Sequence, residues 1–209
     1  MITRGMRYLA DKELLPSNIF DDSLYKTWTK ISYDFMHKES MYESGETVIS
    51  IDKFAEKYAK EKGLSCELTS ADAVFVKNRK LIFVEFKNGL IDKKEKYIVI
   101  KKMYDSFIMY CDIRQMTIKE FRDISEFILV YNGDKNQQTT GKEKPISSES
   151  KKREKDEILP SSGYNAIVEE SDRLSHNEER IRFNLDKYKG YLYSNVHTYT
   201  RELFAAYMK

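Results

Sequence analysis

Two short apolar runs, separated by a polar turn, mark the middle of the chain. Residues 73–76 read AVFV, residues 81–84 read LIFV, and the polar sequence KNRK lies between them. This pattern predicts a β-hairpin, and its unbroken apolar character predicts strands that are covered on both faces. A third apolar run, Phe127–Tyr131, ends at the turn sequence Asn132-Gly133 and predicts a further strand of the same sheet.

Helical periodicity flanks the hairpin on both sides. Ile51–Ala59 carries apolar residues at helical spacing and predicts an amphipathic helix. After the break at Asn88-Gly89, Asp92 is placed to cap a second helix. Apolar residues at helical spacing predict its buried face: Tyr97, Ile100, Tyr104, Phe107, Ile108 and Cys111.

The two ends of the chain also predict helices. Asp22–His37 carries a predicted inner face of Leu24, Tyr25, Trp28, Ile31, Ser32 and Phe35. We interpret Trp28 as a core residue rather than a platform for base stacking. Near the other end, Thr200 is placed to cap a last short helix. Leu203, Phe204 and Tyr207 are predicted to line the inner face of that helix.

The segment Gly133–Ser162 differs in composition from the rest of the chain. It is rich in Lys, Glu, Ser and Gln and has few apolar residues, which predicts a mobile polar loop at about residues 134–162. A helix is expected to resume over residues 164–180. The stretch from Phe183 to Tyr207 is rich in aromatic residues interleaved with basic ones, and core packing is favoured there over a stacking surface.

Composition favours one domain spanning residues 1–209, since 41% of the residues are hydrophobic and can supply a core. The net charge of +2 excludes a generic polyanion binder, so any contact with nucleic acid must come from local patches. Cys66 and Cys111 are too few for a zinc site or a disulfide framework, and Cys111 is expected to fill core space. His37, His176 and His197 show no metal-ligand spacing.

Three ionisable residues at the predicted hairpin carry the candidate chemistry. Asp72 opens the first strand where the second strand ends, so a hairpin brings it close to Glu85. Glu85 and Lys87 lie two residues apart and therefore point to the same face of their strand. Two carboxylates suit a hard divalent cation such as Mg²⁺, and such an ion can activate water against a phosphodiester. The alternative is that Glu85 and Lys87 form a surface ion pair and that Asp72 is a turn residue.

These residues resemble the PD-(D/E)XK nuclease superfamily, whose pattern is an acidic residue on one strand followed by Glu/Asp-x-Lys on the next. The resemblance covers about residues 51–113, and the proline of the pattern is replaced by Ala71. It implies an α/β fold with a central mixed sheet flanked by helices, a restriction-endonuclease-like core with helical additions at both ends. It also implies that Asp72 and Glu85 ligate Mg²⁺ or Mn²⁺ and that Lys87 assists the nucleophile.

Members of this superfamily often add a glutamate from the helix before the sheet. Glu56 is the nearest candidate, with Glu39, Glu43, Glu46 and Glu67 left open. The helix after the motif is rich in lysine, and Lys93, Lys94, Lys101 and Lys102 are candidates for contact with phosphates. A solvated lysine face is the competing interpretation.

The sequence thus predicts a metal-dependent nuclease that acts on nucleic acid, on DNA rather than RNA, in a role such as defence, restriction or repair. Two alternatives remain open: a nucleic-acid-binding protein on the same fold without cleavage, and a small interaction or accessory protein. We expect a cytoplasmic location and no membrane partner, because no apolar run reaches transmembrane length and no signal peptide opens the chain. A homodimer is a further option.

Overall fold

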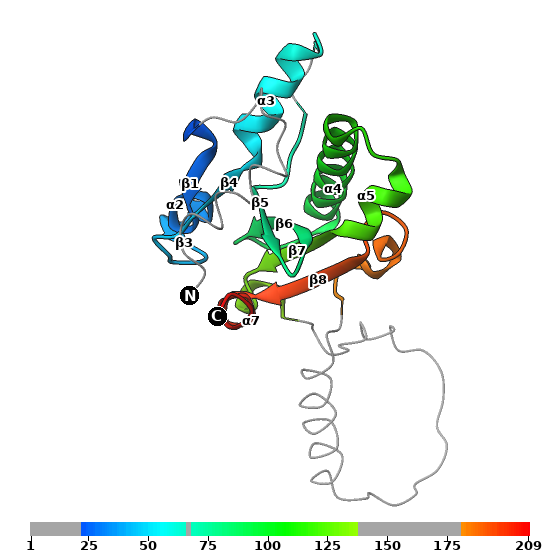
Figure 1. Cartoon of the computed structure of the whole chain (residues 1–209). Helices are drawn as coiled ribbons and strands as arrows, with labels where there is room; N and C mark the ends of the chain where they lie inside the picture. Colours follow the sequence, from blue (N-terminus) through cyan, green and yellow to red (C-terminus); the bar gives the residue numbers. More distant parts are fainter. Residues whose placement is uncertain (1–21, 66–67, 138–180) are drawn as a thin grey trace, which may run out of the picture. The chain divides into compact units, whose positions relative to one another are not determined.

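A six-stranded sheet forms the centre of the fold (Figure 1). The structure, a computed structural model, describes residues 22–65, 68–137 and 181–209. Among these, the strands lie in the order β1-β4-β5-β6-β7-β8, antiparallel from β1 to β6 and parallel from β6 to β8. Their bounds are Tyr25–Thr27, Thr47–Ser50, Ala73–Lys77, Lys80–Lys87, Ser125–Tyr131 and Asn195–Thr200, respectively. The predicted α/β class with a mixed sheet is confirmed.

Helices cover both faces of this sheet (Figure 1). One face packs against α3 (Ile51–Glu61), α4 (Lys93–Arg114) and α5 (Ile118–Ile124), and the other against α2 (Trp28–Ile31) and α7 (Arg201–Tyr207). Within the described residues, the remaining elements are the two-stranded β2–β3 hairpin (Tyr33–Asp34 and Glu39–Ser40) and three short 3₁₀ turns, η1 (Asp22–Leu24), η2 (Asp134–Asn136) and η3 (Asp186–Tyr188).

The predicted central hairpin is confirmed as β5 and β6, in a register that pairs Ala73 with Val84 and Lys77 with Lys80. The strands extend further into the polar sequence than predicted, so only Asn78 and Arg79 form the turn. Both have positive φ, 52° and 61°, as the tight two-residue turns that suit the twist of a hairpin require.

Side-chain alternation along β6 divides the core into two layers. Leu81 and Phe83 face the layer under α3, α4 and α5, whereas Ile82, Val84 and Phe86 face the layer that contains Trp28 and Phe204. Glu85 follows Leu81 and Phe83 in the same alternation, so it belongs to the face that α4 covers. The hairpin is therefore buried on both sides, as the continuous apolar runs predicted.

The prediction of one helix over Asp22–His37 is wrong. Residues 25–27 form β1, which pairs with β4, and the Thr27 side chain then accepts a hydrogen bond from Lys30 N and starts the four-residue α2. The chain leaves the helix at Ser32, whose hydroxyl donates to Tyr42 O. Trp28 is 2% exposed, as predicted, but Phe35 is 84% exposed on the β2–β3 hairpin instead of lying in the core.

The helices α3, α4 and α7 occur where the sequence predicts them, with Asp92 and Thr200 as capping residues. The predicted inner face of α4 is partly wrong, because Tyr97 and Ile108 are exposed and Val99, Met103 and Tyr110 are buried. Leu203 is also exposed. In each of these two helices more than one row of apolar residues has helical spacing, and packing against the sheet decides which row is buried.

Two units divide the chain, residues 1–136 with 181–209 and residues 137–180. Beyond residue 137, the predicted polar loop and the predicted helix over 164–180 lie outside the described residues, as does Cys66. Cys111 is buried in the core, as predicted. In the part of the chain that the structure describes, no helix combines the length and the apolar character that crossing a membrane requires.

Candidate metal and phosphodiester site

Asp72 and Glu85 meet at one end of the β5–β6 hairpin, as the sequence predicts. Asp72 N donates a hydrogen bond to Val84 O at 3.0 Å, and Asp72 Oδ2 accepts one from Phe86 N at 2.7 Å. Asp72 is thus fixed to β6 on both sides of Glu85, by its backbone amide at Val84 and by its carboxylate at Phe86.

Glu85 is the most unusual side chain of this group, because it is a buried acid that is 1% exposed. Burial under α4, and then the negative charge of Asp72, raises the pKa of Glu85 to about 8. Its Oε1 atom is buried and accepts no hydrogen bond from the described residues, but Lys102 Nζ and Lys87 Nζ lie 2.9 Å and 3.6 Å from it. A buried carboxyl with an unused lone pair is costly unless a cation or a further donor satisfies it.

Lys102 supplies a cation between the two carboxylates. Its Nζ atom lies 3.2 Å from Asp72 Oδ1 and 2.9 Å from the Glu85 carboxylate, with the hydrogen bond directed to Oε2. Burial alone would lower the pKa of Lys102, but attraction to Glu85 and Asp72 outweighs that effect and raises it. The space between Asp72 and Glu85 is therefore one that favours a positive charge.

Lys87 lies on the same strand face as Glu85, as strand alternation predicts. The distance from Lys87 Nζ to Glu85 Oε1 is 3.6 Å. Its hydrogen bond, 2.9 Å long, goes to Glu95 in the first turn of α4. Glu95 thus holds the Lys87 ammonium at the edge of the carboxylate pair.

Asp52 is a third carboxylate near the pair, which the sequence interpretation missed. Ile51 N donates to Asp72 O at 3.2 Å, so the first turn of α3 begins beside Asp72. Asp52 Oδ1 accepts a hydrogen bond from Ser70 at 2.8 Å. The residue is exposed, yet desolvation of its carboxyl, and then the charge of Asp72, raises the pKa of Asp52 above its ordinary value.

Glu56, the predicted helix acid, is exposed one turn further along α3. The signal that could have identified Asp52 is its position two residues after the end of β4. That strand pairs with the start of β5, where Ser50 lies opposite Ala73. Among the other glutamates, Glu39 contributes to a different polar network described below, and Glu67 lies outside the described residues.

A pocket of about 290 Å³ opens onto these residues. Asp72, Glu85, Lys87 and Lys102 form one wall, and the residues of the β2–β3 hairpin region form the opposite wall: Ile31, Ser32, Tyr33, Asp34, Phe35 and Met41, with Phe86 and Asn88 also in the lining. The pocket lies where β6 ends, and the carboxyl ends of strands are the usual ligand sites of open α/β sheets.

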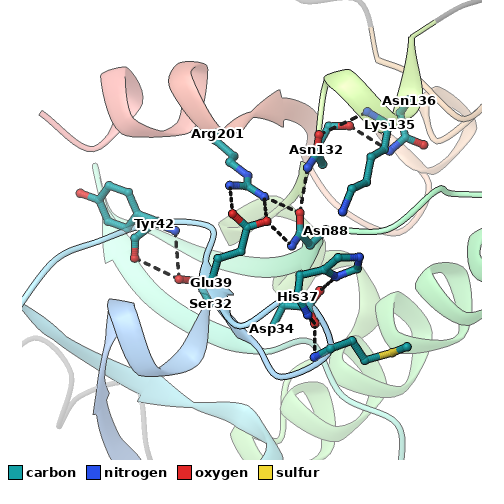
Figure 2. Close-up of polar contacts among 11 residues, drawn as sticks. Ser32, Asp34, His37, Glu39, Tyr42, Asn88, Asn132, Lys135, Asn136 and Arg201 are labelled. Atoms are coloured by element: carbon teal, nitrogen blue, oxygen red, sulfur yellow. Dashed lines mark hydrogen bonds and ion pairs between the residues drawn. The ribbon is translucent and has the colours of Figure 1, made fainter.

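A polar network joins the β2–β3 hairpin to the carboxyl ends of β6, β7 and β8 (Figure 2). Glu39 accepts hydrogen bonds from Arg201 and Asn88, each at 2.8 Å, and Asn132 donates to Asn88 at 2.8 Å. The hydrogen bond from Arg201, followed by that from Asn88, lowers the pKa of Glu39 to about 2. This network fixes the hairpin relative to the strand ends.

Only one of the four predicted phosphate-binding lysines reaches the carboxylates. Lys102 is that residue, and its ammonium is used by the two acids rather than offered to solvent. Lys101 pairs with Asp105 at 2.7 Å and bonds to Thr69, while Lys93 and Lys94 are exposed at the start of α4. Their contact with phosphates stays a prediction.

A divalent cation suits the donors that are present. Mg²⁺ takes one or two carboxylates from a protein and completes its shell with water and substrate oxygens. Asp72 and Glu85 offer two, and both are already paired with the Lys102 ammonium. The described residues contain no cluster of three or more His, Cys, Asp or Glu side chains arranged to hold a metal. Because Lys102 already lies between the two carboxylates, a metal ion would share the site with Lys102 or displace it.

Comparisons with known protein families, with curated proteins and with solved structures found no match to this chain. The resemblance to the nuclease superfamily therefore rests on Asp72, Glu85 and Lys87 alone. The fold and the site define an α/β protein with a mixed sheet and, at a strand end, a pair of carboxylates bridged by a lysine ammonium.

Proposed function

We propose that this protein is a metal-dependent nuclease that hydrolyses phosphodiester bonds, with DNA preferred over RNA. The observation that carries the proposal is the pair of Asp72 and Glu85 around one cationic group, with Lys87 beside them, on the wall of a single pocket. The Glu85 carboxyl is buried on the wall of this pocket, where Lys102 Nζ and Lys87 Nζ lie 2.9 Å and 3.6 Å from its Oε1 atom.

In this proposal each side chain has a distinct role. Asp72 and Glu85 would hold Mg²⁺ or Mn²⁺, which lowers the pKa of a bound water and offsets charge on the phosphate oxygens. Lys87, fixed by Glu95, orients the attacking water and stabilises the negative charge that develops on the phosphate. Asp52 adds negative charge from α3, and Lys102 neutralises the acids while no metal is bound. A cytoplasmic location is part of the same proposal.

The direct test is cleavage of labelled single-stranded DNA, duplex DNA and RNA in Mg²⁺, in Mn²⁺ and in EDTA. We expect cleavage that depends on metal, is fastest on DNA and is lost in Asp72→Asn. Glu56→Gln is the matched control, because it removes an exposed acid of the neighbouring helix and is expected to leave cleavage intact. Absence of cleavage on every substrate, or full activity of Asp72→Asn, contradicts the proposal.

A second function has support from Lys102. Its ammonium already bridges Asp72 and Glu85 and supplies the positive charge that a bound metal would provide. The second candidate is therefore a nucleic-acid-binding protein that does not cleave. The two functions differ in metal binding. Calorimetric titration with Mn²⁺ gives a heat that is lost in Asp72→Asn if the protein is a nuclease, and no heat in either protein if Lys102 is the permanent cation.

A further inference from the structure

The β2–β3 hairpin (Tyr33–Ser40) presents apolar side chains to solvent beside the carboxylate pair. Phe35 is 84% exposed, Met36 is 90% exposed and Tyr33 is 38% exposed. Single exposed apolar residues are common on proteins, but three within four residues, two of them lining a polar pocket, are typical of a binding surface. Tyr33 and Phe35 both line the pocket that contains Asp72 and Glu85.

The hairpin holds these aromatic rings in a defined position. The Phe35 ring contacts the Tyr33 ring edge to face, with centroids 5.0 Å apart and planes at 84°. Asp34 Oδ1 accepts hydrogen bonds from Met36 N and His37 N, and Asp34 Oδ2 is 2.7 Å from His37 Nδ1. The turn is therefore closed by its own side chains, and Figure 2 shows Asp34 and His37 side by side.

The base of the same hairpin is attached to the sheet. Glu39 binds Arg201 and Asn88, as described above, and the Ser40 hydroxyl donates to Thr29 O at 3.0 Å. An exposed aromatic ring on a fixed support loses little conformational freedom when it binds a flat partner. The position and exposure of Phe35 thus suit a stacking platform.

We propose that Phe35, supported by Tyr33, stacks on an unpaired base of a nucleic-acid strand whose phosphate lies at Asp72 and Glu85. The inference rests on the proposed function and names its substrate class: a strand with an unpaired nucleotide at the scissile bond. A base and its phosphate are covalently linked, so one pocket with an aromatic wall and a cation-binding wall fits a single nucleotide unit. Lys38, in the turn of the hairpin, and Lys135, whose charge acts on Glu39, are both exposed and would provide charge for the neighbouring phosphates.

Equilibrium binding of fluorescent oligonucleotides tests this without cleavage. Anisotropy is measured in EDTA and again in Ca²⁺, with a single-stranded oligonucleotide, its fully paired duplex and an abasic strand of the same length. We expect the single strand to bind most tightly and Phe35→Ala to weaken its binding about tenfold or more, since one base–aromatic contact has about that effect. Phe35→Trp is expected to retain binding, and the abasic strand to bind the wild type and Phe35→Ala equally.

Tyr191→Ala is the matched control, because Tyr191 is another exposed aromatic residue, 61% exposed, that precedes β8 at the other end of the parallel strands. It is expected to bind as the wild type does. Equal binding by Phe35→Ala and the wild type, an equal loss on the abasic strand, an equal loss in Tyr191→Ala, or no binding by the wild type overturns the inference. Binding with the expected pattern but no cleavage in Mg²⁺ overturns only the nuclease function.

Discussion

Replacing Glu85 by glutamine tests whether this buried carboxyl destabilises the metal-free protein. Burial, and then the charge of Asp72, raises the pKa of Glu85 from 4.5 to about 8. Between these two values the folded protein binds more protons at Glu85 than the unfolded chain does. The free energy of unfolding therefore falls as the pH rises through this window. Linkage arithmetic gives a fall of about 3 kcal/mol from about pH 5.5 to about pH 8.

Glutamine has nearly the shape of protonated glutamate and does not titrate, so Glu85→Gln removes this contribution. We expect the free energy of unfolding of the variant to exceed that of the wild type by a margin that grows by about 3 kcal/mol between about pH 5.5 and about pH 8. The raised pKa of Lys102 lies above the window. Lys102 therefore stays protonated throughout and adds no slope of its own.

Urea unfolding in EDTA, followed by far-ultraviolet circular dichroism at several pH values, measures the difference. Glu56→Gln, an exposed glutamate on α3, is the control and is expected to follow the wild type at every pH. The reasoning is refuted if Glu85→Gln is less stable than the wild type near pH 8. That result would mean that an ionised Glu85 supports Lys102, since breaking a buried ion pair costs about 3–5 kcal/mol.

Four further substitutions have defined outcomes. Lys87→Ala should reduce single-turnover cleavage about 10²–10³-fold, as loss of one preorganised charge does, and leave Mn²⁺ affinity in calorimetry unchanged; cleavage at the wild-type rate would remove Lys87 from the mechanism. Lys102→Met should raise the calorimetric affinity for Mn²⁺, because the ammonium occupies the space between the acids, and an unchanged affinity would show that the metal binds elsewhere. Asp52→Asn should slow cleavage in Mg²⁺, whereas equal rates would leave Asp52 a structural partner of Ser70. Phe83→Ala should lower the free energy of unfolding by about 3–5 kcal/mol in urea titrations, because Phe83 is fully buried against Tyr110; a loss below about 1 kcal/mol would contradict the central place of this ring in the core.

Local sequence patterns determined the central part of the fold and two of its three acids. The alternation of β5 and β6 and the short turn between them were sufficient to bring Asp72 beside Glu85 and to place Lys87 on the same face. The helix caps at Asp92 and Thr200 could also be predicted from the sequence, because a capping side chain binds a backbone group only three residues away. Such features depend on neighbours along the chain.

The stretch around Trp28 shows where local patterns fail. Its apolar spacing suits a helix, yet residues 25–27 pair with β4, which lies 20 to 24 positions further along the chain. The chain then turns out into the β2–β3 hairpin. The same turn exposes Phe35, which the helical pattern placed in the core. Pairing with a distant strand overrides helical periodicity because local propensity is weak and packing in the folded protein decides between the two.

What the sequence by itself determined was therefore the pair of carboxylates, the lysine beside them and the strands that hold them. What only the tertiary structure decided was their surroundings. Lys102, one of several equivalent lysines in the sequence, is the one whose helical position faces the end of β6. Asp52 approaches Asp72 only because α3 starts beside β5. Which side chains meet across elements depends on how a helix lies over a sheet, and residue spacing within one element does not encode that placement.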